Sequence, residues 1–378
     1  MIDPATFLDS IRKQGVNYYV GVPDSLLKDL CAYLGENVDQ ERHVISANEG
    51  NAVGLAAGWY LGSGQPAMVY MQNSGIGNSF NPLVSLADPE VYSIPMVLVV
   101  GWRGAPGTKD EPQHMKQGRI MTSLLDALEI PYFIMDGMTD VDAKISDACA
   151  SMYRRMAPVV ILIMPGAFAH QTSLRKKGEE YQVSREDAMK AVVSCLSPQD
   201  VVVSTTGKLS RELYEHRRRE GASECRDFLT VGSMGHASSI AMALSSALAD
   251  RKVICLDGDA SVIMHMGSMA TIGQKAPGNL VHIVLNNGSH ESVGGQPTVG
   301  FSIDFVGIAK SCGYRDAVSV HDIDGIIGAM ARFLDAIGPS FLEIRVSMKA
   351  RSDLGRPVET PVENRKAFMR ACGSDTRR

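Results

Sequence analysis

The stretch Leu256–Ser289, LDGDASVIMHMGSMATIGQKAPGNLVHIVLNNGS, decides the fold of the second half of the chain. A short apolar run ends at Gly258-Asp259-Ala260, a helix-like segment follows, and a second apolar run ends just before Asn287. Asp259 and Asn287 are 28 positions apart (287 − 259), the length of one strand–helix–strand unit. Such a unit places both side chains at the carboxyl ends of neighbouring parallel strands, where open α/β sheets bind ligands.

The residue types at these strand ends favour a magnesium ion. A carboxylate, an amide oxygen and nearby main-chain carbonyls are hard oxygen ligands, and Mg²⁺ is usually held by a few such groups together with phosphate oxygens. The helix start after Asp259 offers unpaired N–H groups to the same phosphates. The stretch therefore predicts a site for Mg²⁺ and a diphosphate. The alternative is an ordinary strand–helix–strand unit with an aspartate and an Asn-Asn pair in its turns.

Strand-like and helix-like segments alternate along the whole chain, which predicts parallel sheets covered by helices on both faces, the doubly wound α/β class. A polar stretch interrupts the alternation, so we expect a first domain over residues 1–168, a linker over 169–183 and a second domain over 184–378. The segment after Ala350 is rich in Arg, Pro and Glu and is interpreted as an irregular arm. The predicted strands are 18–21, 43–46, 67–71, 95–101, 132–135 and 159–164, then 201–204, 228–231, 253–256, 281–285 and 341–346.

The bulk properties exclude several classes of protein. The 378 residues carry a net charge of −5 with both signs mixed, so we expect neither a nucleic-acid nor a membrane partner. The seven cysteines are scattered without a CxxC pair, which favours a reducing cytoplasm and argues against structural zinc. The amino terminus has no apolar signal segment and the longest apolar run is too short to span a bilayer, so we expect a cytoplasmic protein.

Two further motifs lie at predicted strand ends. Glu49 ends a short strand and begins a helix of small residues, as in SANEGNAVGLAAG, residues 46–58. A glutamate favoured there by the helix dipole is the alternative interpretation. The second motif is the turn Gly232-Ser233-Met234-Gly235, which can equally be a glycine-rich turn with a methionine in the core.

Together these motifs resemble the signature of the thiamine diphosphate (ThDP) enzymes. The resemblance implies that Mg²⁺ is bound by Asp259, Asn287 and the main-chain carbonyl of Ser289, and that Glu49 hydrogen-bonds N1′ of the aminopyrimidine, which helps the cofactor to deprotonate its own C2. Met234 would hold the two cofactor rings in their bent conformation. The remaining residues assigned to the cofactor by the resemblance are Gly232, Ser233, Gly258, Ala260 and Ser261. The third glycine that is usual in the diphosphate motif is Ala260 here.

The resemblance also implies an architecture. A pyrimidine-binding domain comes first and a diphosphate-binding domain second, without the middle domain that larger members carry between them. In this family the cofactor lies between the pyrimidine domain of one subunit and the diphosphate domain of another. A homo-oligomer, at least a dimer, with active sites between subunits is therefore expected, acting on a small 2-keto acid.

Three segments indicate which 2-keto acid is the substrate. Residues 21–25 (GVPDS), 101–114 (GWRGAPGTKDEPQH) and 354–357 (LGRP) resemble the phosphonopyruvate decarboxylases and, slightly less, the sulfopyruvate decarboxylases. The resemblance implies that 3-phosphonopyruvate loses CO₂ through an enamine of the cofactor and gives phosphonoacetaldehyde, in phosphonate biosynthesis. The alternatives are sulfopyruvate decarboxylation and another ThDP-dependent decarboxylation or carboligation.

Charged and polar side chains in the first two of these segments are candidates for the substrate site. Arg103, Lys109, His114 and Ser25 could bind the second anion of the substrate, because arginine and lysine are the usual partners of phosphonate-like groups. His114 and Asp24 could handle protons near the reacting carbon. The alternative is a solvated charged loop.

Two other classes of function fit less well. A non-catalytic cofactor-binding subunit would need Asp259 and Asn287 but not Glu49. A nicotinamide dehydrogenase is disfavoured because Gly75-Ile76-Gly77 is not followed by the glycine that completes a dinucleotide-binding turn.

Overall fold

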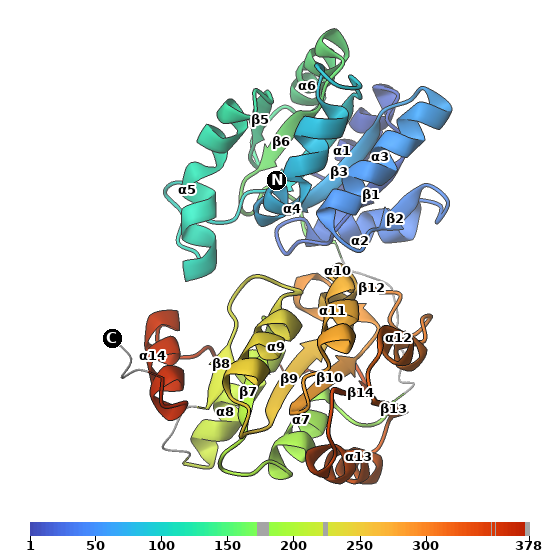
Figure 1. The fold of residues 1–378 in the computed structure, drawn as a ribbon. Coiled ribbons are helices and arrows are strands. Elements are labelled where there is room, and N and C mark those ends of the chain that lie inside the picture. Colours follow the sequence, from blue (N-terminus) through green and yellow to red (C-terminus); the bar gives the residue numbers. More distant parts are fainter. Residues whose placement is uncertain (172–180, 222–225, 349, 352, 375–378) are drawn as a thin grey trace. The chain divides into compact units, whose positions relative to one another are not determined.

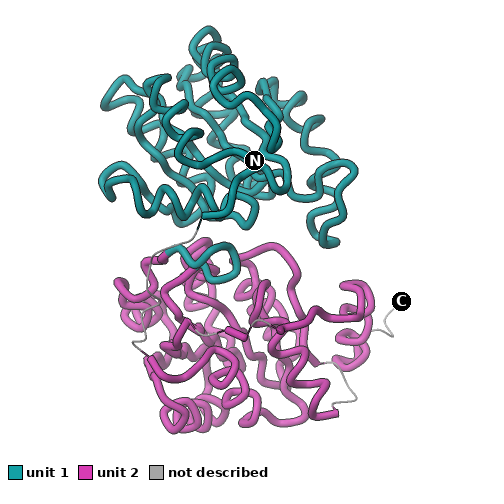
Figure 2. The backbone as a smooth tube through the Cα atoms, turned by 180° about the vertical axis from the view of Figure 1, so that it is seen from behind, with its two compact units in different colours: residues 1–175, 290–296 teal, residues 176–289, 297–378 magenta. Residues whose placement is uncertain are grey.

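The computed structural model describes residues 1–171, 181–221, 226–348, 350–351 and 353–374. The chain forms two compact units, residues 1–175 with 290–296 and residues 176–289 with 297–378 (Figure 2). Each unit contains a six-stranded parallel sheet covered by helices on both faces (Figure 1), which confirms the predicted fold class. Most of the predicted linker, residues 172–180, lies outside the described residues, so the domain boundaries stay a prediction.

The sheet of unit 1 has the strand order β2-β1-β3-β4-β6-β5, with every neighbouring pair parallel. Its strands are β1 Tyr19–Gly21, β2 His43–Ile45, β3 Ala67–Gln72, β4 Met96–Gly101, β5 Tyr132–Met135 and β6 Val159–Ile163. Its helices are α1 Pro4–Lys13, α2 Lys28–Asn37, α3 Glu49–Ser63, α4 Ile76–Pro82, α5 Pro112–Ala127 and α6 Val141–Arg155, with short turns η1 Asn73–Gly75 and η2 Leu83–Ala87.

The central strands of unit 1 are buried on both faces, as near-continuous apolar runs predict for a parallel sheet. All residues of β4 and β6 are buried. Side chains that alternate along the strands enter two apolar clusters, one on each face of the sheet. Helix α3 begins at Glu49 because the side chain of Asn48 caps it, accepting a hydrogen bond from the N–H of Asn51 at 2.9 Å. Glu49 is thereby fixed at the carboxyl edge of the sheet.

The sheet of unit 2 has the order β13-β14-β10-β9-β7-β8 and is also parallel throughout. Its strands are β7 Val201–Ser204, β8 Asp227–Leu229, β9 Val253–Gly258, β10 Leu280–Asn286, β13 Asp316–Val320 and β14 Ser340–Arg345. Its helices are α7 Arg185–Ser194, α8 Lys208–Arg219, α9 Ala237–Ala247, α10 Asp259–Met264, α11 Gly267–Lys275, α12 Phe305–Cys312, α13 Ile323–Asp335 and α14 Pro361–Ala371. A separate two-stranded ladder joins β11 Ser289–His290 to β12 Gln296–Pro297, around the turn η3 Glu291–Val293.

The prediction of an irregular arm after Ala350 was wrong over Pro361–Ala371, which forms helix α14. Thr360 and Glu363 make a capping box, each side chain accepting a hydrogen bond from the backbone N–H of the other, and Pro361 occupies the first turn. Phe368 anchors the helix, because it is 5% exposed, belongs to an apolar cluster of unit 2, and has its ring centroid 5.7 Å from that of Phe228 on β8.

Helix α14 also meets the edge of the sheet. The side chain of Asn364 accepts a hydrogen bond from the N–H of Leu229 at 3.2 Å and donates one to the carbonyl of Asp227 at 3.0 Å. Both partners belong to β8, the outermost strand on that side. The asparagine amide thus binds the backbone of β8 where a further strand would otherwise pair.

Candidate active site

The residues predicted to bind Mg²⁺ lie together at the carboxyl edge of the unit 2 sheet. Asp259 is the first residue of α10, directly after β9, and Asn287 directly follows β10. Strands β9 and β10 pair in parallel with Gly258 opposite Leu285, so the two strands end side by side. Asp259, Asn287 and Ser289 are 2%, 5% and 5% exposed.

The carboxylate of Asp259 is buried without a cationic partner in the described part of the chain. Its Oδ2 accepts a hydrogen bond from the hydroxyl of Thr298, and burial raises its pKa to about 6. A Cβ on Gly300 would lie 2.6 Å from that same oxygen, so only glycine fits at this position. A buried carboxylate lacks the hydration that stabilises its charge, and a bound cation would replace that hydration. Sequence reasoning missed both Thr298 and Gly300.

The two asparagines after β10 have different surroundings. Asn286 is fully buried and its amide donates to the carbonyl of Gly300 at 2.8 Å and to Oε1 of Glu343 at 2.7 Å. These contacts hold the loop that contains Thr298 and Gly300 against the strand ends. The side-chain oxygen of Asn287 accepts a hydrogen bond from the N–H of Ser289 at 3.1 Å. The donor set of carboxylate, amide oxygen and main-chain carbonyl fits Mg²⁺.

Ser261, one of the residues predicted to bind the cofactor, lies at the centre of a hydrogen-bonded group. The hydroxyl of Ser261 accepts from the N–H of Gly235 and bonds the hydroxyl of Thr205, both at 3.0 Å. Ser233 and Gly235 have positive φ angles of 52° and 87°, which shapes the tight turn around Met234. This group joins the carboxyl end of β7 to the start of α10 and to the turn that contains Gly232. Thr205 is an addition that sequence reasoning missed.

In unit 1, Glu49 is 5% exposed at the first position of α3. The amide of Asn78 donates to its Oε2 at 2.7 Å. Gly75 packs directly against the carboxylate, since a Cβ there would lie 2.5 Å from the Cγ of Glu49 and 2.7 Å from its Oε1. The glutamate is therefore positioned by η1 and α4 as well as by its own helix.

Arg103, which follows β4, is held at both its side chain and its backbone. Its Nε and Nη2 donate to the two carboxylate oxygens of Asp110, the first at 2.7 Å and the second at 2.5 Å, and its Nη1 donates to the hydroxyl of Ser25 at 2.7 Å. The side-chain amide of Asn73 bonds both the N–H and the carbonyl of Arg103. The structure thus brings Ser25 and Arg103 together, and it adds Asp110 and Asn73.

Asp24 and His114, the predicted proton carriers, belong to the same part of unit 1. Asp24 is 1% exposed, its Oδ1 has no hydrogen-bond partner in the described chain, and burial raises its pKa to about 6 despite the positive charge of Arg103. His114 lies in the first turn of α5, and burial and Arg103 lower its pKa to about 4. Lys109 is exposed in the loop, and none of the described residues forms an ion pair with it.

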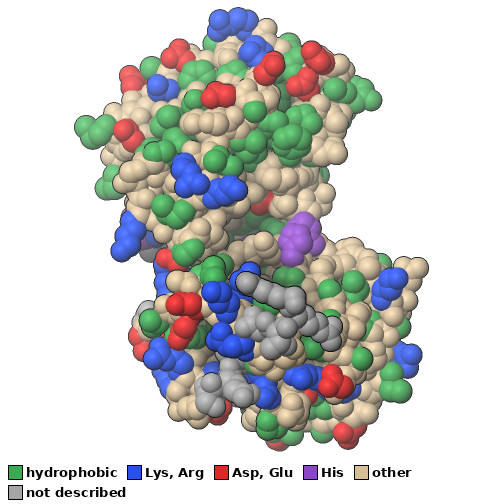
Figure 3. All heavy atoms as spheres, turned by 60° about the vertical axis from the view of Figure 1, so that its left-hand side comes forward, with side chains coloured by type: hydrophobic (Ala, Val, Ile, Leu, Met, Phe, Trp, Pro, Cys, Tyr) green, Lys and Arg blue, Asp and Glu red, His purple; other side chains and the backbone are tan. Residues whose placement is uncertain are grey.

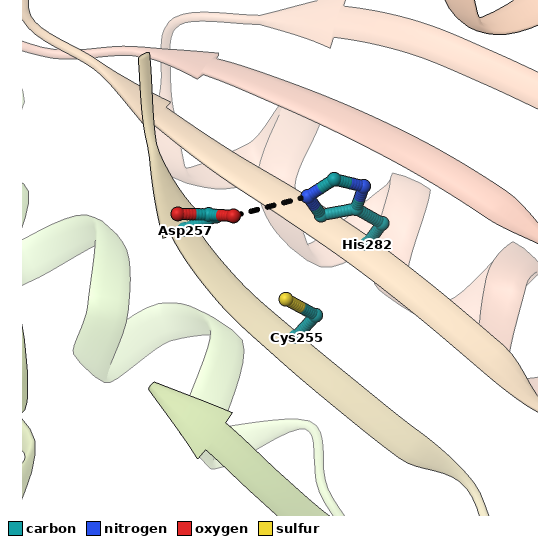
Figure 4. A group of neighbouring side chains, drawn as sticks. All are labelled: Cys255, Asp257 and His282. Carbon is teal, nitrogen blue, oxygen red and sulfur yellow. Dashed lines mark ion pairs between the residues drawn. The ribbon is translucent and has the colours of Figure 1, made fainter. Parts of the chain in front are cut away.

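A second group of ionisable side chains lies inside unit 2, below the strand ends (Figure 4). Cys255 and Asp257 on β9 and His282 on β10 point to the same side of the sheet and are 0% exposed. Nε2 of His282 lies 3.5 Å from Oδ2 of Asp257, and its Nδ1 is 3.0 Å from the hydroxyl of Tyr314. Because Asp257 also accepts from the N–H of Gly258 at 2.9 Å, the group supports the turn that carries Asp259.

Three further features of the described residues are their surface charges, their helices and their cysteines. On the face drawn in Figure 3, acidic and basic side chains are interspersed. Within the described ranges, every helix is too short or too polar to cross a lipid bilayer. The six cysteines in those ranges are free thiols.

Comparison with known proteins identifies the family. Residues 5–129 match the "Thiamine pyrophosphate enzyme, N-terminal TPP binding domain" family and residues 205–344 match the "Thiamine pyrophosphate enzyme, C-terminal TPP binding domain" family. The chain therefore belongs to the thiamine pyrophosphate (ThDP) enzymes, and the prediction of two cofactor-binding domains without a middle domain is confirmed.

Within that family, similar relatives carry two particular names. The chain is 36% identical to the phosphonopyruvate decarboxylase of Streptomyces viridochromogenes, over 97% of this chain and 94% of the relative. It is 33% identical to that of Streptomyces hygroscopicus, over 97% and 93%. It is 28% identical to the sulfopyruvate decarboxylase of Methanosarcina acetivorans, over 91% of each chain.

Proposed function

We propose that this chain is a phosphonopyruvate decarboxylase, which converts 3-phosphonopyruvate to phosphonoacetaldehyde and CO₂ in phosphonate biosynthesis. The observation that carries the proposal is the likeness to two phosphonopyruvate decarboxylases along nearly the whole length of all three chains. Loss of CO₂ is irreversible in practice, so such a step would draw forward the reaction that makes its substrate.

The described residues fit ThDP and Mg²⁺. Asp259, Asn287 and the carbonyl of Ser289 would bind the metal, and the buried, uncompensated carboxylate of Asp259 supports this assignment. The diphosphate would be bound by Ser261 and its neighbours Gly258, Ala260, Gly232 and Ser233, with Met234 against the rings. When bound, ThDP supplies a nucleophilic carbon and an electron sink for decarboxylation of a 2-keto acid.

Glu49 would hold a proton at N1′ of the aminopyrimidine. Its Oε2 is already bound by Asn78, so its position is set before the cofactor arrives, and Oε1 remains for the pyrimidine. A buried, preorganised carboxyl group of this kind is effective because no reorganisation is needed during the reaction.

Asp24 would deliver the proton to the carbon that has lost CO₂. With its pKa raised to about 6, roughly a tenth of Asp24 is protonated at pH 7, about a hundred times more than of an ordinary aspartate. His114 would hold a second proton-accepting nitrogen nearby, since its lowered pKa keeps the ring neutral. Arg103, Lys109 and Ser25 would bind the phosphonate, which must be held while the carboxylate departs.

We also propose a homo-oligomer with active sites shared between chains, in the cytoplasm. The family assignment supports the homo-oligomer, because in ThDP enzymes the cofactor lies between the pyrimidine domain of one subunit and the diphosphate domain of another. In this chain the candidate residues for the pyrimidine and for the diphosphate lie on separate units, as that arrangement requires. The free cysteines in the described residues support the cytoplasmic location, since a reducing compartment keeps thiols unpaired.

A second candidate is sulfopyruvate decarboxylation, favoured by the likeness to the Methanosarcina acetivorans enzyme. One assay separates the candidates: initial rates with phosphonopyruvate, sulfopyruvate and pyruvate, each with ThDP and Mg²⁺. We expect kcat/KM to be highest for phosphonopyruvate. A higher value for sulfopyruvate would contradict the proposal in favour of the second candidate.

A further inference from the structure

The contacts of Asp110 leave no part of its carboxylate free. Oδ1 accepts from Nη2 of Arg103 and from the N–H of Glu111 at 2.7 Å, and Oδ2 accepts from Nε of Arg103 and from the N–H of Gly104 at 2.9 Å. The two main-chain donors fix the carboxylate in its loop. Its ion pair with Arg103 is partly shielded from solvent, with side-chain exposures of 19% for the arginine and 10% for the aspartate.

Arg103 has five side-chain N–H groups, and three of them are used. Nε and one N–H of Nη2 bind Asp110, and one N–H of Nη1 binds Ser25. One N–H on Nη1 and one on Nη2 therefore have no acceptor among the described residues. Because Nε and Nη2 bind Asp110 side by side, the remaining N–H of Nη2 points away from Asp110, on the outer edge of the guanidinium that Nη2 shares with Nη1. An oxygen of a carboxylate, phosphate or phosphonate can accept a charge-assisted hydrogen bond there.

The loop that carries this pair is tightly packed. A Cβ on Gly118 of α5 would lie 1.9 Å from the carbonyl oxygen of Gly104, and a Cβ on Gly104 would lie 2.3 Å from the carbonyl oxygen of His114. The loop and the start of α5 therefore approach each other as closely as glycine allows. Since Asn73 also holds the backbone of Arg103, the guanidinium has little freedom to reorient.

We propose that Asp110 is a positioning residue for substrate recognition: it orients Arg103 so that the free edge of the guanidinium binds the phosphonate of the substrate. The inference rests on the proposed function. The negative charge of Asp110 offsets the charge of Arg103, so the ion pair attracts anions only weakly over long distances. What Asp110 contributes to substrate binding is the fixed direction of the N–H groups of Arg103. A preorganised donor loses less conformational entropy on binding than a free arginine does. Selectivity then arises because pyruvate has a methyl group where phosphonopyruvate has its second anion.

The test compares Asp110→Asn with wild type in the full-length protein loaded with ThDP and Mg²⁺. The asparagine keeps one oxygen but loses the charge and one acceptor, so Arg103 can rotate away. We expect KM for phosphonopyruvate to rise roughly ten- to a hundredfold, the effect of one charge-assisted hydrogen bond. The change in KM for pyruvate should be much smaller. The selectivity, measured as the ratio of kcat/KM for phosphonopyruvate to that for pyruvate, should therefore fall. Asp126→Asn, at an exposed aspartate on helix α5, which follows the loop of Asp110, is the matched control and should leave the selectivity as it is.

Two further measurements distinguish a positioning role of Asp110 from a general structural effect of its substitution. Ser25→Ala removes the third contact of Arg103 with a minimal change and should narrow the selectivity in the same direction by a smaller factor. Calorimetric titration of phosphonoacetate into each protein reads anion binding without turnover, and affinity should fall in Asp110→Asn and in Ser25→Ala. Equal losses for phosphonopyruvate and pyruvate, or unchanged phosphonoacetate binding in both variants, would overturn the inference. If wild type fails to turn over phosphonopyruvate but binds phosphonoacetate with an affinity that Asp110→Asn lowers, the proposed function fails and the anion site at Arg103 stands.

Discussion

The side-chain amide of Asn78 donates a hydrogen bond to Oε2 of Glu49 at 2.7 Å, joining the first turns of α3 and α4. This contact occupies one oxygen of the carboxyl group and leaves the other to a ligand. A glutamine at position 49 could make similar hydrogen bonds but could not hold the proton that the aminopyrimidine requires. We therefore expect Glu49→Gln to bind ThDP with nearly unchanged affinity and to lose about 10²–10⁴-fold in kcat. Turnover close to wild type would exclude Glu49 from the mechanism.

Gly75→Ala tests the packing around Glu49 without changing its chemistry. The new methyl group would lie 2.5 Å from Cγ of Glu49, so the carboxylate must move. We expect kcat to fall by roughly tenfold or more, as small displacements of catalytic groups do. Gly77→Ala is the matched control, because a Cβ there meets nothing within 4 Å and a helical alanine is favoured by about 0.5–1 kcal/mol. Equal activity of the two variants would contradict the assignment of Gly75.

Asp259→Ala should abolish activity through loss of Mg²⁺ and ThDP. The carboxylate is the charged member of the proposed ligand set, and without it the diphosphate charges repel each other unscreened. Excess Mg²⁺ and ThDP should restore part of the activity by mass action. Calorimetry of ThDP binding in the presence of Mg²⁺ checks this, with exposed Asp304→Asn as the control in the same unit. Unchanged cofactor affinity in Asp259→Ala would refute the metal site.

Mixing two inactive variants tests whether active sites are shared between chains. Glu49→Gln retains an intact diphosphate half and Asp259→Ala an intact pyrimidine half. If each site combines halves from two chains, a mixed dimer has one complete site, and random mixing restores about a quarter of wild-type activity. If each site were built within a single chain, no exchange of subunits could restore it. The measurement is activity after the two proteins are unfolded, mixed and refolded together.

The raised pKa of Asp24 predicts how the free energy of unfolding depends on pH. Its pKa is about 6 in the folded chain against 3.8 for the free side chain, so the folded state binds the proton more tightly. Protonated Asp24 thus contributes stability that is fully present below pH 3.8 and is lost as the pH rises through 6, about 3 kcal/mol in all. Asp24→Asn has no such loss, so its free energy of unfolding relative to wild type should increase between pH 4 and pH 7. Denaturant unfolding of both proteins at each pH gives the difference. Parallel pH profiles would show that Asp24 ionises normally.

The sequence was sufficient to predict those features of the fold and the site that depend on residues close together in the chain. The strands before Gly258 and Asn287 are continuous apolar runs, and their lengths place Asp259 and Asn287 at one sheet edge. Strand β13, Asp316–Val320, was missed because its sequence, DAVSV, is short and partly exposed. Thr298 and Asp110 were missed for another reason: each reaches its partner through a loop, and no periodic pattern predicts where a loop folds. Helix α14 could have been predicted, since Thr360-Pro361-Val362-Glu363 is a capping-box sequence.

The bond between Asn364 and strand β8 has a consequence for how the protein behaves in solution. An outermost strand exposes unpaired N–H and C=O groups, which invite pairing with a strand of another molecule. Asn364 occupies one donor and one acceptor of β8, and α14 adds bulk beside them. Removing the segment from Thr360 onward would therefore expose this edge together with the apolar surface under Phe368, and the shortened protein should aggregate through intermolecular β-pairing even if its active site stays intact.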